Sequence, residues 1–356
     1  MADRVTIQDI ADALGVSRNT VSKAINNTGI LAEATRNRVL QKAVEMGYKQ
    51  FSYVNISGAG QTGSTLSHGT DKSEIALFTS NFIGNSHFAS TMLDKFQREL
   101  SMLGYSFTMH RLQPHESESL AMPASYNKER TAGIICIEMF NRAYCSMLCT
   151  LDTPLLFVDA PVSGLEPPLK ADLLIMDNQS NIHCFVKEMV RRGKKKIGFI
   201  GKSTHCQSFF ERFLGYRNAM YLSGLTCPEE YCIIDDKSQD NDSGFSTYQE
   251  YLADRIQNLK TMPDVFICAN DFIAIDTLQS FKKLGISVPQ DIYLCGFDDS
   301  PESRILSPTL TTIHIHSQIM GFSAVNLLMS RIKEPSLNFR TIHTETSLIY
   351  RESTED

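Results

Sequence analysis

Short, strongly apolar runs recur along the chain from residue 74 onward, and stretches with helical periodicity separate them. The runs are EIALFTS, GIICIE, PLLFVDA, LLIMD, KIGFIG, VFICAN and IYLCGFDD, and the helical stretches include 90–103, 182–192 and 272–284. A run of four to eight apolar residues is typical of a strand buried on both faces. Such strands alternating with helices predict a doubly wound α/β fold built on parallel sheets.

This alternating region is longer than one such sheet usually needs. We therefore predict a body, residues 74–356, made of two similar lobes with a cleft between them. Lobe 1 is expected to comprise 74–174 and 315–337, and lobe 2 to comprise 175–312 and 340–356. The body is preceded by residues 51–73, which hold the Gly-, Ser- and Thr-rich segment SGAGQTGSTLSHGTDKS. This composition predicts a flexible linker.

Three short helices are predicted before the linker. The first begins at Thr6, and Asp9 three residues later completes a capping-box pattern. Gly15 ends this helix, because glycine enters a left-handed turn without strain, and Ser17 caps the second helix. A third helix is expected over 34–46. The side chains expected to pack between the helices are Ile7, Ile10, Ala11, Leu14, Val21, Ala24, Ile25, Val39, Leu40, Ala43 and Val44.

Charge is distributed unevenly along the chain. The net charge is -6, but residues 1–50 hold seven Lys or Arg against five Asp or Glu and are therefore +2, which leaves -8 for the remainder. A basic head on an acidic body is typical of a chain whose head alone faces phosphate. We predict that residues 1–50 form an all-α helix-turn-helix DNA-binding domain whose second helix enters the major groove.

The second predicted helix begins with side chains suited to reading bases. Arg18 is able to bind guanine and Asn19 to pair with adenine, and Lys23 lies one turn after Asn19. Nearby hydroxyl and amide groups suit phosphate contacts, which position a protein without specifying sequence. The predicted DNA-binding residues are Thr6, Ser17, Arg18, Asn19, Thr20, Ser22, Lys23 and Asn26. The alternative interpretation is a solvated helix face.

The segment TIQDIADALGVSRNTVSKAINN resembles the head of the lactose-repressor (LacI/GalR) family of bacterial regulators. It has the family's Thr, Asp-Ile-Ala, Gly-Val-Ser, Thr-Val-Ser and Asn in order, and TRNRVLQKAVEMGYK is similar to the third helix. The resemblance implies that Arg18, Asn19 and Lys23 are the base-reading positions.

The chain departs from this family after Tyr48. The family continues with a Pro-Asn step and an Ala/Leu-rich hinge helix, whose leucine enters the minor groove and kinks the operator. Here the sequence reads QFSYVNISGAGQTG, in which no Ala/Leu-rich helix is apparent. Either Val54 or Ile56 makes a weaker wedge, or the DNA is held without that kink.

The body resembles the same family. FFERFLGYRNAM is similar to its Arg-x-x-Gly-Tyr segment and ICANDFIAI to its Ala-Asn-Asp; YLCGFDDSPESRILSPTLTTIHIHSQIMG carries Gly-Phe-Asp-Asp and Pro-x-Leu-Thr-Thr-Ile. PLLFVDA and LLIMDNQS match strands that end in Asp159 and Asp177. The resemblance implies a periplasmic-binding-protein-like body that binds a small-molecule effector and forms a homodimer through its lobes.

Polar residues at the predicted strand ends suit a sugar-like effector. Sugar hydroxyls donate and accept hydrogen bonds; Arg212 supplies a rigid fork of donors, Asp298 accepts, and Asn270 does both. Ligands bind at strand ends in open α/β sheets. The predicted effector-binding residues are Phe82, Phe88, Asp159, Arg212, Asn270 and Asp298. The polar ones have helix capping or loop structure as their alternative role, and Asp271 is expected to be a structural cap.

Together these features predict a cytoplasmic, dimeric transcriptional repressor that binds a palindromic operator and a small molecule, without a cofactor or a membrane partner. The N-terminus lacks a signal-peptide apolar region, and no run approaches the ~18 apolar residues of a membrane span. Nine irregularly spaced cysteines indicate reduced thiols. Two joined heads also bind DNA with a higher effective concentration than one.

Two other classes of protein remain as alternatives. One is a transport-type sugar-binding protein, and the other is an enzyme with a vestigial DNA head. The sequence has neither the Gly-x-Ser-x-Gly elbow nor the His-Glu-x-x-His motif of common hydrolases. His314 and His316 alternate on a predicted strand and so share a face, but no third metal ligand is obvious, and we predict no metal site.

Overall fold

The computed structural model describes residues 5–26, 31–46, 72–80, 87–164, 166–238 and 244–355. The chain divides into two compact units, and it passes from one to the other three times. Unit 1 comprises Met1–Met176 and His316–Glu345, and unit 2 comprises Asp177–Ile315 and Thr346–Asp356. Phe82 and the predicted hinge region 51–58 lie outside the described residues. Within the described ranges, no helix is both long and apolar enough to cross a membrane.

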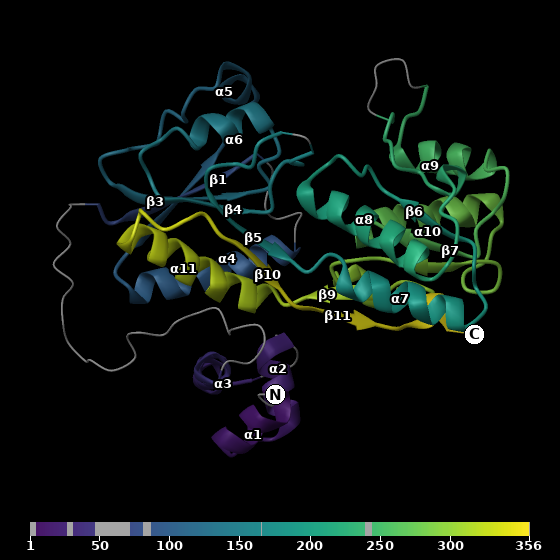
Figure 1. Ribbon diagram of the computed structural model, residues 1–356, viewed down its shortest axis with the longest axis horizontal. Helices are drawn as coiled ribbons and strands as arrows, with labels where there is room; N and C mark the ends of the chain where they lie inside the picture. The colour runs from purple at the N-terminus through teal and green to yellow at the C-terminus, as the bar shows by residue number, and fades with distance from the viewer. Residues whose placement is uncertain are drawn as a thin grey trace. The chain divides into compact units, whose positions relative to one another are not determined.

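The head contains three helices, α1 (Ile7–Leu14), α2 (Arg18–Asn26) and α3 (Glu33–Glu45) (Figure 1). The predicted capping box is confirmed, since Thr6 Oγ1 accepts the Asp9 N–H at 3.3 Å and Asp9 Oδ2 accepts the Thr6 N–H at 2.7 Å. Gly15 ends α1 with φ of 65°. Ser17 Oγ accepts the Thr20 N–H at 3.0 Å and so caps α2, as predicted.

A small apolar core holds these helices together. Its fully or almost fully buried side chains are Ile10, Ala11, Val21, Ala24, Ile25, Val39, Leu40 and Ala43. The predicted inward residues Ile7 and Leu14 are partly buried at its edge. Helices of 8 to 13 residues are marginal in isolation, so their stability depends on this shared core.

Unit 1 is built on a six-stranded sheet in the order β10-β5-β4-β3-β1-β2, in which every pairing is parallel. The strands are β1 (Glu74–Thr79), β2 (Ser106–Arg111), β3 (Thr131–Ile137), β4 (Leu155–Val158), β5 (Asp172–Met176) and β10 (Thr341–Thr344). The helices are α4 (His87–Met102), α5 (Pro114–Ser119), α6 (Arg142–Leu148) and α11 (Ser317–Lys333). In Figure 1, α4 and α11 lie on one face of the sheet and α5 and α6 on the other. This is the predicted doubly wound arrangement.

Two strands of this sheet were not predicted. The edge strand β2 has mostly exposed or half-buried side chains, so it lacks the apolar run of a central strand. The last strand, β10, corrects a predicted boundary, because residues 340–345 were expected in lobe 2. Instead β10 pairs with β5, with Thr341 opposite Leu173 and Thr344 opposite Met176.

Unit 2 has a central parallel sheet in the order β6-β7-β8 and an antiparallel pair, β9 with β11. The strands are β6 (Ile197–Ile200), β7 (Val265–Cys268), β8 (Tyr293–Cys295), β9 (Thr312–Ile315) and β11 (Thr346–Ile349). The helices are α7 (Ser180–Arg191), α8 (Gln207–Leu222), α9 (Tyr248–Gln257) and α10 (Asp271–Leu284), and the short 3-10 turns are η2 (Glu229–Tyr231), η3 (Glu302–Arg304) and η4 (Glu352–Thr354).

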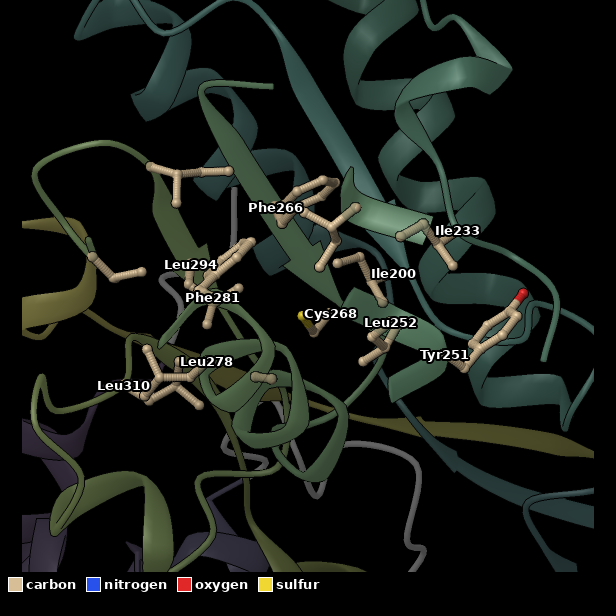
Figure 2. Packing of buried hydrophobic residues seen from close by; sticks show 14 residues of the cluster. Ile200, Ile233, Tyr251, Leu252, Phe266, Cys268, Leu278, Phe281, Leu294 and Leu310 are labelled. Carbon is tan, nitrogen blue, oxygen red and sulfur yellow. The ribbon is translucent and has the colours of Figure 1, made fainter. Parts of the chain in front are cut away.

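Side chains from the sheet, α9 and α10 form the core of unit 2 (Figure 2). Phe266 of β7 stacks on Phe281 of α10, with ring centroids 6.1 Å apart. Gly198 in β6 faces this cluster, and a Cβ there would lie 2.2 Å from the Tyr231 carbonyl oxygen and 2.6 Å from the Phe266 ring. Glycine therefore allows the backbone and an aromatic ring to approach the strand closely.

Asp172 in unit 1 is a fully buried carboxylate held by two arginines. Arg331 of α11 donates to it at 2.9 and 3.1 Å, and Arg340 donates from its side chain at 3.0 Å and its backbone N–H at 2.8 Å. Burial raises the pKa of Asp172, but the hydrogen bonds from Arg331 and Arg340 outweigh burial and lower the pKa below its ordinary value. The carboxylate thus ties α11 and the start of β10 to β5.

Asp172→Asn should strongly destabilise unit 1. The variant leaves the buried guanidinium of Arg331 without its counter-ion, and breaking such a pair costs about 3–5 kcal/mol. Urea unfolding should show a clearly lower midpoint. Asp152→Asn, at an exposed position, is the matched control and should change stability by less than about 0.5 kcal/mol. Equal midpoints for the two variants would contradict this account.

Asp271 in unit 2 is a second fully buried carboxylate. Its Oδ2 accepts the Ser300 N–H at 2.7 Å, and its Oδ1 accepts the Thr312 hydroxyl at 2.6 Å. Burial, with the negative charge of Asp298 adding to it, raises the pKa of Asp271 to about 7. The side chain was expected to cap a helix; it instead joins α10 to two later segments.

Asp271 should make unit 2 less stable as pH rises. Its pKa is raised on folding from 3.8 to about 7, so between these values the folded chain keeps a proton that the unfolded chain has released. The free energy of unfolding therefore falls with rising pH across this window, by no more than about 4 kcal/mol. Asp271→Asn should remove this slope in urea titrations from about pH 5 to pH 8. The control variant Asp254→Asn, at an exposed position on α9, should keep the wild-type dependence on pH. If Asp271→Asn also keeps this dependence, Asp271 is not the group whose pKa is raised on folding.

Candidate DNA-binding surface and effector site

Helix α2 presents a polar face opposite its buried stripe. Arg18 and Asn19 are exposed in its first turn, and Lys23, partly exposed, follows Asn19 by one turn. Val21 and Ala24 are fully buried on the opposite side. The structure therefore leaves the three predicted base-reading side chains accessible on a helix that its own core holds in place.

The predicted phosphate-contacting hydroxyls have structural partners. Thr6 Oγ1 donates to Asp9 Oδ2 at 2.8 Å, and the Ser17 and Thr20 hydroxyls lie 2.8 Å apart. A phosphate contact by Thr6 would have to replace its bond to Asp9. Ser22 is partly buried, and the side chain of Asn26 at the end of α2 lies outside the described part of the chain. These positions remain predictions.

Arg212 on α8 is the centre of the candidate effector site in unit 2. Its side chain is 3% exposed. Nε donates to Asn178 Oδ1 at 2.9 Å and Nη1 donates to the Ala269 carbonyl at 2.6 Å. The guanidinium lies 3.5 Å from the centroid of the Phe297 ring, a cation–π contact. These contacts fix the plane of the guanidinium, and Nη2 makes no hydrogen bond to any residue that the structure describes.

Asp298 lies on a strained turn next to Arg212. Its Oδ1 is 3.5 Å from Arg212 Nη1, and its side chain is 24% exposed. Asp298 and Asp299 have φ of 113° and 54°, a region that side-chain-bearing residues rarely adopt. The Asp298 N–H donates to the Ile313 carbonyl at 2.8 Å, and the bonds from Ser300 and Thr312 to Asp271 hold the neighbouring backbone. Asp298 is thus presented in a fixed position.

The two aspartates of this turn have different roles. Asp299 is 2% exposed and accepts hydrogen bonds from Arg351, from Arg304 at 2.6 Å and from His314 at 2.9 Å. Burial opposes ionisation of Asp299, but these bonds outweigh it and hold the pKa well below its ordinary value. Asp299 therefore has a structural role in unit 2. His314, one of the two alternating histidines in the sequence, thus contacts a carboxylate. In the described ranges no group of three His, Cys, Asp or Glu side chains is arranged to hold a metal ion.

Asn270 combines a structural role with a predicted effector contact. Its Oδ1 accepts the Ile273 N–H at 3.0 Å and caps α10, the alternative role noted from the sequence. Its Nδ2 donates to no residue within the described ranges. Because Asn270 directly follows Ala269, whose carbonyl binds Arg212, unit 2 brings Arg212, Asp298 and Asn270 to neighbouring positions at the carboxyl ends of β7 and β8.

The other described effector candidates belong to unit 1. Asp159 directly follows β4 with φ of 59°, and its Oδ1 accepts the Ala160 N–H at 2.8 Å. Phe88 is half-buried in the first turn of α4. Both lie at the carboxyl end of the unit 1 sheet, where ligands bind in such folds, and their effector contacts remain predictions.

Two contacts of Arg212 were missed in the sequence. Asn178 is almost fully buried and orients the Arg212 Nε, and Phe297 lies under the guanidinium. Both stand beside residues that the motifs did identify, since Asn178 follows Asp177 and Phe297 precedes Asp298. The motifs locate both residues in the sequence, but they do not show which way each side chain points.

Two family models match the chain, one for each predicted part. The model for bacterial regulatory proteins of the lacI family matches residues 6–50, and the model for a periplasmic binding protein-like domain matches residues 186–354. Among curated relatives, the HTH-type transcriptional repressor PurR of Photobacterium profundum is 26% identical and covers 99% of each chain. The HTH-type transcriptional regulator GalR of Lacticaseibacillus casei is 28% identical over 98% of this chain and 99% of its own length.

Solved structures share the fold over nearly the whole chain. The transcriptional regulator CelR in complex with cellobiose has a TM-score of 0.66 at 23% identity, covering 98% of this chain and 100% of its own. The lac repressor dimer bound to operator and the anti-inducer ONPF has a TM-score of 0.64 at 20% identity, covering 99% and 100%. The predicted fold class is confirmed. With both parts matched and in the same order, the chain belongs to the lacI family of bacterial regulatory proteins.

Proposed function

We propose that the protein is a sequence-specific transcriptional repressor whose affinity for its operator is controlled by a small molecule rich in hydroxyl groups, such as a sugar. The observation that carries this proposal is the exposed face of α2, with Arg18, Asn19 and Lys23, in a head of the lacI family. The names of its curated relatives support DNA-binding regulation. The cellobiose complex of a structural neighbour supports a sugar-type ligand.

The site in unit 2 supplies the groups that a polyhydroxyl ligand needs. Arg212 Nη2 and Asn270 Nδ2 are donors with no described protein partner, and the partly exposed Asp298 carboxylate is an acceptor. Each hydroxyl both donates and accepts, so donors and an acceptor held on one rigid frame select a defined pattern of hydroxyl groups. We propose these three residues, with Asp159 and Phe88, as effector contacts.

Dimerisation would allow effector binding to change operator affinity. We propose residues 1–50 as the DNA-binding domain, 51–73 as the linker and 74–356 as the effector-binding and dimerisation domain of a cytoplasmic homodimer. Two heads on one palindromic operator bind with a high effective concentration. An effector that favours one arrangement of the two units changes the spacing of the heads, and hence operator affinity. No observation favours the enzyme or transport alternatives, and the relatives are regulators.

Lys23→Ala should weaken the preference for operator over random duplex while the body remains folded. The operator is first selected from a random duplex library with the full-length protein, and the two affinities are then compared by gel shift at several salt concentrations. Loss of one base contact lowers the free energy that distinguishes operator from random duplex by about 1–3 kcal/mol. Asn19→Ala should have a similar effect. Lys283→Ala, exposed on α10, is the control. An affinity ratio that stays at the wild-type value in both head variants would exclude these side chains as base readers.

Asp298→Asn should weaken effector binding without changing operator binding in the absence of effector. A thermal-shift screen of sugars with the wild-type protein identifies the effector, and calorimetry then measures its affinity. A hydrogen bond to a charged group contributes about 1.5–3 kcal/mol, which corresponds to a loss of roughly tenfold to a hundredfold. Asp254→Asn on α9 is the control. Wild-type affinity in Asp298→Asn would place the effector elsewhere.

A further inference from the structure

The segment that follows β11 is polar in sequence but buried in the structure. Ser353 and Thr354 of η4 are at most 1% exposed. Ser353 Oγ donates to the Leu294 carbonyl of β8 at 2.6 Å and accepts the Thr311 N–H at 2.8 Å. The Thr311 and Thr354 hydroxyls lie 2.6 Å apart. Burial of polar groups is costly unless they are hydrogen-bonded, and these bonds fix η4 against β8 and against the residue that precedes β9.

Arg351 directly precedes η4 and contacts the connection between β8 and β9. Its backbone N–H donates to Thr311 Oγ1 at 2.8 Å. Its Nη1 donates to Ser303 Oγ at 3.0 Å and to the Leu310 carbonyl at 2.8 Å, and its Nη2 donates to Asp299 Oδ1. The side chain is only 16% exposed. One guanidinium therefore holds three positions of this connection from a segment that is itself fixed.

Asp299 directly follows Asp298 in a turn that needs such support. Their φ values of 54° and 113° are ones that side-chain-bearing residues keep only where surrounding contacts fix the backbone. Besides Arg351, the Asp299 carboxylate binds Arg304 and His314. Arg304 belongs to the same connection and its side chain is 47% exposed. Arg351 and His314 thus anchor the turn to other elements, and of the two the arginine is always charged.

We propose that Arg351 is a positioning residue of the effector site. Through Asp299 it holds the turn, so that the Asp298 carboxylate is in place before the effector binds. This inference rests on the proposed function, in which Asp298 contacts the effector. A group that is already ordered loses less conformational entropy on binding, and the affinity is correspondingly higher. Arg351 thus acts on the effector through Asp299 and Asp298 rather than by direct contact.

Hydrogen–deuterium exchange of the full-length protein without effector tests whether Arg351 holds the turn. In Arg351→Ala, the backbone amides of residues 298–303 should exchange about tenfold faster than in the wild-type protein, because the turn opens more often. Arg351→Lys is a milder second variant that keeps the charge but not the fork of donors, and its exchange should be intermediate. Wild-type exchange of this turn in both variants would overturn the proposal.

Arg192→Ala is the matched control for these variants. Arg192 also binds the segment after β11, since its Nη1 donates to the Thr354 carbonyl at 2.7 Å. Among the described residues, its side-chain hydrogen bonds are to Glu188 and Thr354, and none is to Asp299. Arg192→Ala should therefore lower the stability of unit 2 but leave exchange of residues 298–303 at the wild-type rate.

A double-mutant cycle separates positioning from general stability. Calorimetry with the sugar selected in the thermal-shift screen is performed at a temperature at which every variant is folded. Arg351→Ala should bind this sugar about tenfold more weakly, Arg351→Lys should recover part of the loss, and Arg192→Ala should keep the wild-type affinity. In the Asp298→Asn background Arg351→Ala should have little further effect, because the carboxylate that Arg351 positions is absent.

The outcomes of this cycle distinguish the inference from the proposed function. Wild-type affinity in Asp298→Asn would remove Asp298 from the effector site, and the inference would fail together with that assignment. Weaker binding in Asp298→Asn but wild-type affinity in Arg351→Ala would overturn the inference alone. Losses that add in the double variant would do the same, because they would show that Arg351 acts independently of Asp298.

Discussion

The buried carboxylate of Asp271 determines how unit 2 presents its polar residues. It accepts hydrogen bonds from Ser300, which directly follows the turn at Asp298 and Asp299, and from Thr312 of β9, and the cost of burying its charge appears as a raised pKa. This turn holds Asp298 and Asp299 at positive φ, which costs on the order of 1–3 kcal/mol per residue. Such strain persists when surrounding bonds over-determine the backbone. The placement of Asp298 beside Arg212 therefore depends on a residue that is itself fully buried.

The elements with strong local signals were predictable from the sequence. The capping box at Thr6, the left-handed Gly15 and the cap at Ser17 depend on residues at most three positions apart, so the pattern contains all the interacting groups. The buried strands were recognisable because both faces are apolar. The edge strands β2 and β10 were not predicted, since β2 carries polar side chains and β10 is identified only by its pairing with a strand about 170 residues earlier.

Prediction of the candidate site has the same limit, because local motifs are visible in the sequence and long-range contacts are not. Motifs placed Arg212, Asp298 and Asn270, because their position at strand ends or in a family segment is a property of the sequence. The support of Arg212 by Asn178 and Phe297 depends on residues 34 and 85 positions away. Likewise, nothing local indicated that Asp271 is buried while Asp298 is partly exposed, because burial is set by the packing of α10 against later segments. Long-range partners thus explain what sequence reasoning missed.

The three passages of the chain between the units restrict how the units are able to move. The chain leaves unit 1 after Met176, returns after Ile315 and leaves again after Glu345. One covalent tether would leave two rigid bodies almost all of their rotational freedom. Three tethers must change their backbone torsions together, so few combinations of rotation satisfy all of them. Relative motion of the two units is therefore confined to fewer independent rotations than a single connection would allow.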